Sequence, residues 1–157
     1  MGKIRVGMTV NAPLEHVYSV ARALEEYPSF MSSLKKIEIL DRDECGDNVR
    51  ARWHAEAKLV LTKRKMCWVQ KDAWDNEEMV CCSTVDPREP GQYKHFDAKW
   101  YFKPHPKGTE MNIVVDYQLD HPLMTPAIHK IIDVIMEKNN RSLLESIKRR
   151  AESTCPQ

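Results

Sequence analysis

The sequence has no long apolar run and little glycine. Five glycines in 157 residues are too few to suggest a glycine-rich loop of the kind that cradles nucleotide phosphates. No stretch approaches the length of about 20 apolar residues that crosses a membrane. The opening segment MGKIRVGMTV also lacks the apolar block of a secretion signal. We therefore expect neither a membrane span nor secretion, and a cytoplasmic location.

An excess of charge of one sign is also missing. The chain carries 24 lysines and arginines against 23 aspartates and glutamates, for a formal net charge of +1. This balance gives no electrostatic basis for binding nucleic acid or an anionic membrane. The basic run Lys63-Arg64-Lys65 is more typical of a solvated strand than of a phosphate-binding patch.

Cysteine and histidine occur without the spacing of a disulfide framework or a metal site. The five cysteines are odd in number and include no C-x-x-C pair, which predicts free thiols in a reducing compartment. The six histidines are scattered and show no ligand spacing. A G-x-S-x-G motif and a recognisable Cys-His pair are absent as well. The sequence predicts no metal and no cofactor.

The most regular segment is the last thirty or so residues, which predict one long helix. Thr125 followed by Pro126 is a start signal, because the hydroxyl can accept from free backbone amides and proline is preset at a helical φ. The end is marked by Lys148, Arg149 and Arg150, cations that the helix dipole favours there. At about 1.5 Å per residue the helix would be roughly 40 Å long. Apolar residues at three-and-four spacing predict one buried face: Ile128, Ile131, Ile132, Ile135, Met136, Leu143, Leu144 and Ile147.

Asn139 interrupts this apolar face, one turn after Ile135 and one turn before Leu143. A buried amide without partners costs about 1–3 kcal/mol. Either the helix is rotated so that Asn139 is wetted, or the middle of the helix faces a cavity rather than packed core.

The rest of the chain predicts strands separated by turn clusters. Alternation over residues 3–10 indicates a strand, Pro13 begins a short helix to about Leu24, and a second helical turn follows around Ser29–Ser33. Turn clusters include Trp74-Asp75-Asn76. Six further strands are expected at Lys36–Asp41, Asn48–Ala57, Leu59–Lys71, Glu78–Val85, Gln92–Lys103 and Glu110–Asp120.

Consecutive strands with short loops imply an antiparallel meander, and one with this many strands curls. We therefore predict an α+β fold: a curved antiparallel sheet of about seven strands wrapped around a long C-terminal helix, with two short helices after the first strand. Residues 1–153 would form a single domain, and 154–157 a short tail. A curved sheet that grips one helix tends to leave an elongated apolar cavity.

Alternation along the strands predicts the residues that line this cavity. Phe96 and Trp100 share the apolar face of their strand, and Trp53 is expected as core or wall on another. Arg64 shares a face with Trp68. An inward guanidinium needs a partner, which a ligand oxygen or Asp72 could supply; alternatively, a bulge or a shifted register places Arg64 in solvent.

Four segments carry a resemblance to a known family: TVNAPLEHVYSVARALEEYPSFMSSLKKIEIL, GQYKHFDAKWYF, GTEMNIVVDYQLD and the tail LLESIKRR. They resemble the START-like, helix-grip superfamily, and within it the polyketide aromatase/cyclase (cyclase/dehydrase) branch. The resemblance implies a cavity that takes a poly-β-keto chain from an acyl carrier protein and promotes aldol ring closure and dehydration. The superfamily also includes non-catalytic carriers of hydrophobic ligands such as quinones, lipids or aromatic metabolites, and this alternative stays open.

The resemblance also implies roles for particular residues. Tyr27 matches an aromatic at the pocket mouth, and Trp68 and Trp100 match pocket tryptophans. The family's arginine falls near Asp72, so Arg64 would have to supply the cation that stabilises an enolate oxygen. The resulting hypothesis has Arg64 and Asp72 as catalytic residues and a substrate-binding set of Tyr27, Trp53, Trp68, Phe96, Trp100 and Asn139.

Overall fold

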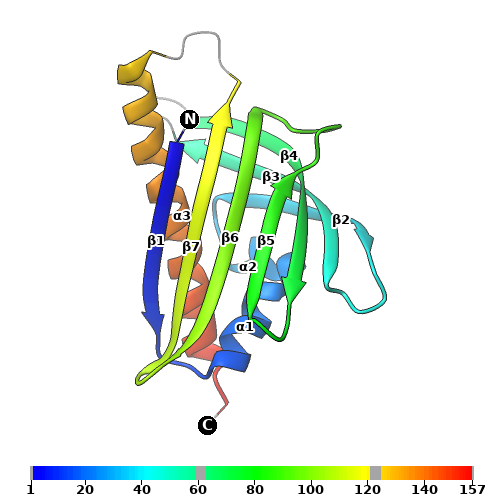
Figure 1. Cartoon of the computed structure of the whole chain (residues 1–157), viewed down its shortest axis with the longest axis vertical. Coiled ribbons are helices and arrows are strands. Elements are labelled where there is room, and N and C mark those ends of the chain that lie inside the picture. The colour runs from blue at the N-terminus through cyan, green and yellow to red at the C-terminus, as the bar shows by residue number, and fades with distance from the viewer. Residues whose placement is uncertain (1, 59–62, 121–124, 157) are drawn as a thin grey trace.

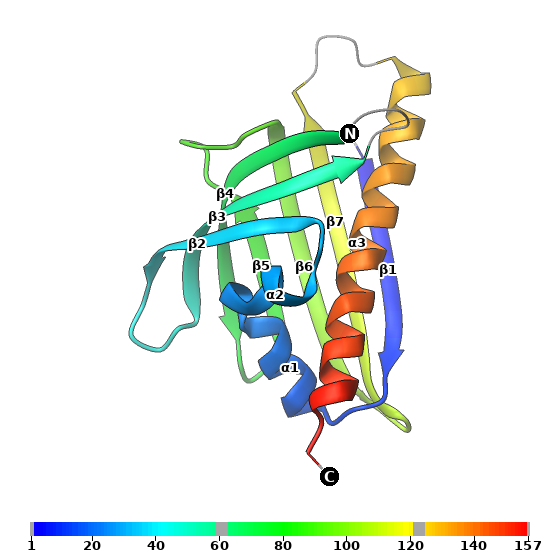
Figure 2. The ribbon, with the colours of Figure 1, turned by 180° about the vertical axis from the view of Figure 1, so that it is seen from behind.

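One long helix lies in the concave face of a strongly curved antiparallel sheet (Figure 1; Figure 2). The computed structural model describes residues 2–58, 63–120 and 125–156. The sheet has seven strands in the order β1-β7-β6-β5-β4-β3-β2, with every neighbouring pair antiparallel. The elements are β1 (Gly2–Val10), α1 (Leu14–Arg22), the 3-10 turn η1 (Leu24–Glu26), α2 (Tyr27–Phe30), β2 (Leu34–Arg42), β3 (Asn48–Lys58), β4 (Lys63–Asp75), β5 (Val80–Val85), β6 (Tyr93–His105), β7 (Gly108–Leu119) and α3 (Pro126–Thr154). The predicted helix-grip fold is confirmed.

The long helix begins where the sequence predicts. The Thr125 hydroxyl accepts a hydrogen bond from the backbone N–H of Ile128 at 3.3 Å, and Pro126 is the first helical residue. Figure 2 shows the helix running along β1 and β7. None of the helices in the described part of the chain combines the length and the apolar character needed to span a membrane.

Burial of α3 is deepest in its second half, although Met136 in the first half is also buried. Leu144, Ile147 and Ala151 are inaccessible to solvent, whereas Ile131 is 51% exposed and Val134 is 66% exposed. The prediction of one buried face along the whole helix therefore holds at Met136 but is wrong at Ile131. The physical reason is that the first half borders an open groove, described below, instead of packed side chains.

Two other boundaries differ from the prediction. Trp74 lies inside β4 and is buried in the core rather than in a turn, because it continues the inward-facing alternation of that strand. The second short helix begins at Tyr27, since proline is tolerated in the first helical turn, where its missing N–H has no intrahelical partner. The first residues of the strand expected at Leu59–Lys71 lie outside the described residues.

Aromatic packing fills one end of the concave face. Tyr18 of α1 meets Trp74 and Phe102 edge-on, with ring centroids 5.4 and 5.3 Å apart. Trp100 and Phe102 continue this cluster along β6 in a stacked arrangement. The short helices therefore close the sheet at this end, and open space between sheet and helix remains toward the start of α3.

Candidate ligand-binding site

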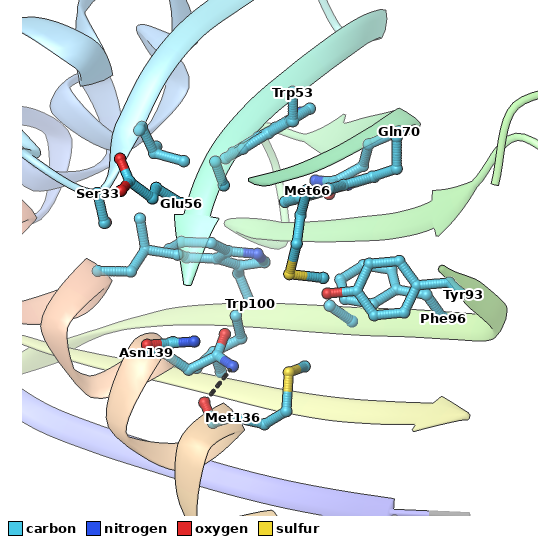
Figure 3. A pocket seen from close by; sticks show the side chains of 17 residues that line it. Ser33, Trp53, Glu56, Met66, Gln70, Tyr93, Phe96, Trp100, Met136 and Asn139 are labelled. Atoms are coloured by element: carbon cyan, nitrogen blue, oxygen red, sulfur yellow. Dashed lines mark hydrogen bonds between the residues drawn. The ribbon is translucent and has the colours of Figure 1, made fainter. Parts of the chain in front are cut away.

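A cavity of about 120 Å³ lies between the inner face of the sheet and the middle of α3 (Figure 3). We call it the inner chamber. Its helix wall is formed by Met136, Asn139, Asn140 and Leu143, and the Asn140 side chain is tied back to the Met136 carbonyl at 2.8 Å. Its sheet wall is mainly aromatic, contributed by β3, β4 and β6: Trp53, Trp68, Tyr93, Phe96 and Trp100.

The aromatic wall is built from paired strand positions. Trp53 and Trp68 are register partners on β3 and β4, and their rings stack at 5.8 Å with an interplanar angle of 15°. Tyr93 meets Trp68 edge-on at 5.5 Å and contacts Phe96 at 4.9 Å. Cross-strand aromatic pairs of this kind hold each other in place. The wall thus offers flat, rigid surfaces to a planar ligand.

A line of polar side chains runs along β4 behind this wall. The Trp68 indole Nε1 donates to Gln70 Oε1 at 3.1 Å, and Gln70 Nε2 donates to Asp72 Oδ1 at 2.9 Å. The Ser83 hydroxyl of β5 donates to the same Asp72 oxygen. An indole N–H can only donate, so Trp68 fixes which end of the Gln70 amide faces it. Gln70 lines the chamber with its amide held in one orientation.

Asp72 is the buried end of this line. It is 4% exposed, and its Oδ2 has no hydrogen-bond partner among the described residues. Burial raises the pKa of the Asp72 carboxyl, although the hydrogen bonds from Ser83 and Gln70 act in the opposite direction.

In the described ranges 2–58, 63–120 and 125–156, no three His, Cys, Asp or Glu residues are grouped so as to hold a metal ion.

The raised pKa of Asp72 makes the stability of the fold depend on pH. The folded state binds the Asp72 proton more tightly than the unfolded state does, so protonation of Asp72 stabilises the fold. This contribution is complete below the ordinary aspartate pKa of about 3.9 and is lost as pH rises through the raised pKa. We expect Asp72→Asn, which cannot ionise, to gain stability relative to wild type across that window, by about 1.4 kcal/mol for each tenfold change in proton affinity.

Urea unfolding of both proteins over a series of pH values measures this difference. Ser83→Ala removes a hydrogen bond that lowers the pKa of Asp72, so it should move the window to higher pH. A stability difference between wild type and Asp72→Asn that stays constant from acid to neutral pH would contradict the prediction.

A second space adjoins the chamber on the side of the exposed half of α3. This outer groove has a volume of about 320 Å³. Its apolar wall is the row of isoleucines at the start of α3, and its polar rim includes Arg64, Gln92 and Asp120. The two spaces share the lining residues Met66, Met136 and Asn139. They are therefore adjacent compartments of one hollow.

The structure brings five of the predicted site residues together in the inner chamber: Trp53, Trp68, Phe96, Trp100 and Asn139. Asn139 is exposed and lines both compartments, so it is wetted and faces the hollow at the same time. Arg64 shares the inward alternation of β4, but it lies in the outer groove and is exposed.

Tyr27 and Asp72 lie behind the chamber wall. Tyr27 is completely buried, its hydroxyl donates to the Ala21 carbonyl, and its ring packs edge-on against Trp53 at 5.9 Å. Asp72 reaches the chamber only through Gln70. Both residues thus support groups that line the chamber.

Sequence reasoning missed several polar residues of the chamber, among them Gln70 and Glu56. Gln70 could have been found, because it follows Trp68 by two positions and therefore shares its face. Glu56 could not, because alternation along β3 assigns it to the outer face. It reaches the chamber edge beside Ser33, whose carbonyl accepts from the Glu56 backbone N–H at 2.8 Å, and its side chain pairs with Lys35 at 3.4 Å.

A curved antiparallel sheet closed by a C-terminal helix over an aromatic chamber defines the START-like, helix-grip class of proteins. Residues 10–144 match the family described as "Polyketide cyclase / dehydrase and lipid transport", and the chain belongs to this family. The resemblance seen in the sequence is thereby confirmed.

Individual relatives agree with this assignment. A protein of Streptomyces cyaneus named "Putative polyketide cyclase" is 25% identical over 130 residues, which cover 80% of each chain. The Zhui aromatase/cyclase from Streptomyces sp. R1128 superposes with a TM-score of 0.83 at 17% identity, over 96% of this chain and 93% of the other. A START superfamily protein from Mycobacterium smegmatis gives a TM-score of 0.78 at 17% identity, over 96% and 97% of the two chains. At such identities the two structures show a shared fold alone.

Proposed function

We propose that the protein is a polyketide cyclase that holds part of a poly-β-keto chain in the inner chamber and promotes aldol ring closure and dehydration. The observation that carries this proposal is the Gln70 amide, which lines an aromatic chamber and is fixed between Trp68 and Asp72. Membership of the cyclase/dehydrase family supports it. An acyl carrier protein would deliver the chain. The free state of all five cysteines favours action in a reducing cytoplasm.

Ring closure requires stabilisation of negative charge on oxygen. An enol carbon of the chain attacks a ketone carbon, one C–C bond forms, and the ketone oxygen takes a proton; loss of that hydroxyl with a neighbouring hydrogen then releases water. Gln70 Nε2 donates one hydrogen to Asp72 and has a second hydrogen for a substrate carbonyl. A donor held in a fixed orientation lowers the energy of the developing oxyanion. Asp72 acts as the residue that positions Gln70.

The direct test is the product profile of a minimal polyketide synthase with and without this protein. We expect the protein to shift products from spontaneous shunt compounds toward one cyclised, dehydrated aromatic. Arg64→Ala should reduce this shift, because Arg64 is the cation on the rim of the hollow. Arg5→Ala, which changes an exposed arginine on the outer face of β1, is the matched control. Identical products with wild type, Arg64→Ala and no protein would refute the cyclase proposal.

A non-catalytic carrier of a hydrophobic ligand is the second candidate. It is favoured by the position of the charges on β4. Asp72 is a buried carboxyl, whereas Arg64, the arginine of this strand, lies in the outer groove and not in the inner chamber, where an enolate would need it. A carrier isolated from its own host should contain an apolar molecule visible by native mass spectrometry. It should also show quenching of Trp68 or Trp100 fluorescence by candidate ligands such as quinones. Protein that is consistently empty and unquenched would exclude this function.

A further inference from the structure

The inner chamber is too small to hold a ligand of several rings. An apolar protein cavity of about 150 Å³ holds one benzene ring, and the chamber measures about 120 Å³. A molecule larger than one ring must therefore extend beyond it. The outer groove is the larger of the two spaces, at about 320 Å³, and it adjoins the chamber directly.

Two methionines lie where these spaces meet. Met66 of β4 and Met136 of α3 line both compartments, and Figure 3 shows their side chains extending from opposite sides of the cavity. Methionine is unbranched and has three rotatable bonds, so it adapts its shape at low energetic cost. Rotation of these two side chains would widen the passage between the chamber and the groove without any backbone movement.

The groove itself has the chemistry of a binding surface. Ile131 lies on its wall and is 51% exposed, although water contact is unfavourable for a side chain of this size. Gln92 is on its rim, and its Oε1 is buried without a hydrogen-bond partner among the described residues. A buried acceptor left unpaired is costly. A ligand with an apolar chain and a hydrogen-bonding end would satisfy both groups.

The charges on the rim indicate the kind of polar end. Arg64 and Asp120 both line the groove, so a fully ionised group of either sign would meet repulsion from one of them. A hydroxyl or an amide both donates and accepts, and suits Arg64, Asp120 and the Gln92 oxygen alike. Arg64 lies four residues from Trp68 on the same face of β4, or about 13 Å at roughly 3.3 Å per residue.

We propose that the chamber and the groove bind one elongated amphipathic molecule. Its aromatic ring lies against Trp53 and Trp68, its chain passes between Met66 and Met136 along the isoleucines of α3, and its hydroxyl or amide end meets Gln92 and Arg64. This inference rests on the proposed function, in that it requires the inner chamber to be a ligand site. It adds the shape and the polarity of the ligand.

Calorimetric titration with phenylethanol and phenyloctanol tests this proposal. Phenylethanol is long enough only for the chamber, whereas phenyloctanol spans the distance to the rim. Because each methylene buried in the groove adds affinity, phenyloctanol should bind at least about tenfold more tightly. Ile131→Glu, which places a carboxylate on the groove wall, should remove most of this advantage and leave phenylethanol binding unchanged.

Val134→Glu is the matched control. Val134 is 66% exposed and lies on the same helix one turn after Ile131, but it is not among the residues that line the groove. Both variants change exposed positions, so their thermal unfolding should match that of wild type, and Val134→Glu should bind both alcohols normally. Equal affinity of wild type for the two alcohols, or equal effects of the two variants, would overturn the two-compartment proposal while leaving the chamber intact. Failure of both alcohols to bind wild type would overturn the proposed function itself.

Discussion

Leu144→Ala is expected to lower the free energy of unfolding by about 2–5 kcal/mol, whereas Leu143→Ala should cost clearly less. The Leu144 side chain is 0% exposed and belongs to the half of α3 that is packed into the sheet. Its truncation leaves a cavity that rigid neighbours on the sheet cannot fill. Leu143 is only partly buried and already borders the inner chamber, so its truncation enlarges an existing space.

Urea denaturation of the two variants and wild type measures this difference. The residues are chemically identical neighbours on one helix, which removes helix propensity and residue type as explanations. Leu143→Ala should in addition change the affinity for chamber ligands, because it alters the lining. Equal losses of stability would mean that Leu143 is packed as tightly as Leu144, contrary to the chamber that Leu143 borders.

The fold could be predicted because its signals are local. Alternation of apolar residues defines each strand, and Thr125-Pro126 defines the start of α3. Short connections then leave an antiparallel meander as the simplest arrangement. Trp74 was misassigned because Asp75 and Asn76 follow it and resemble a turn, whereas the strand ends only after Asp75. Local turn chemistry was outweighed there by burial of the indole against Tyr18.

The site could be predicted only in part, because its shape depends on distant segments. Alternation correctly assigned Trp53, Trp68 and Trp100 to the inner face. It could not show that the first half of α3 stands away from packed core, since the spacing of Ile128 and Ile131 is the same whether a helix faces a core or a groove. It also could not show whether Asp72 contacts a ligand or supports Gln70, because both lie on the same face of β4.

Gln70→Leu is expected to have the largest functional effect of any substitution in the chamber. It removes the acceptor of the Trp68 indole and one of the donors to Asp72. An indole N–H buried without a partner costs about 1–3 kcal/mol, and the fixed donor to the substrate is lost with the amide. We expect formation of the cyclised product to fall by about a hundredfold to a thousandfold, the scale on which loss of one oxyanion donor acts.

Asp72→Asn separates positioning by Gln70 from acid–base chemistry by the carboxyl. The variant keeps an oxygen that can accept from Gln70 Nε2 and from Ser83, the two partners of Asp72 Oδ1, but it cannot transfer a proton. If Asp72 serves to hold the Gln70 amide, this variant should form product at nearly the wild-type rate while Gln70→Leu does not. Loss of product with Asp72→Asn, in a protein that remains folded and binds chamber ligands, would instead make the carboxyl itself the reacting group and Gln70 its link to the substrate.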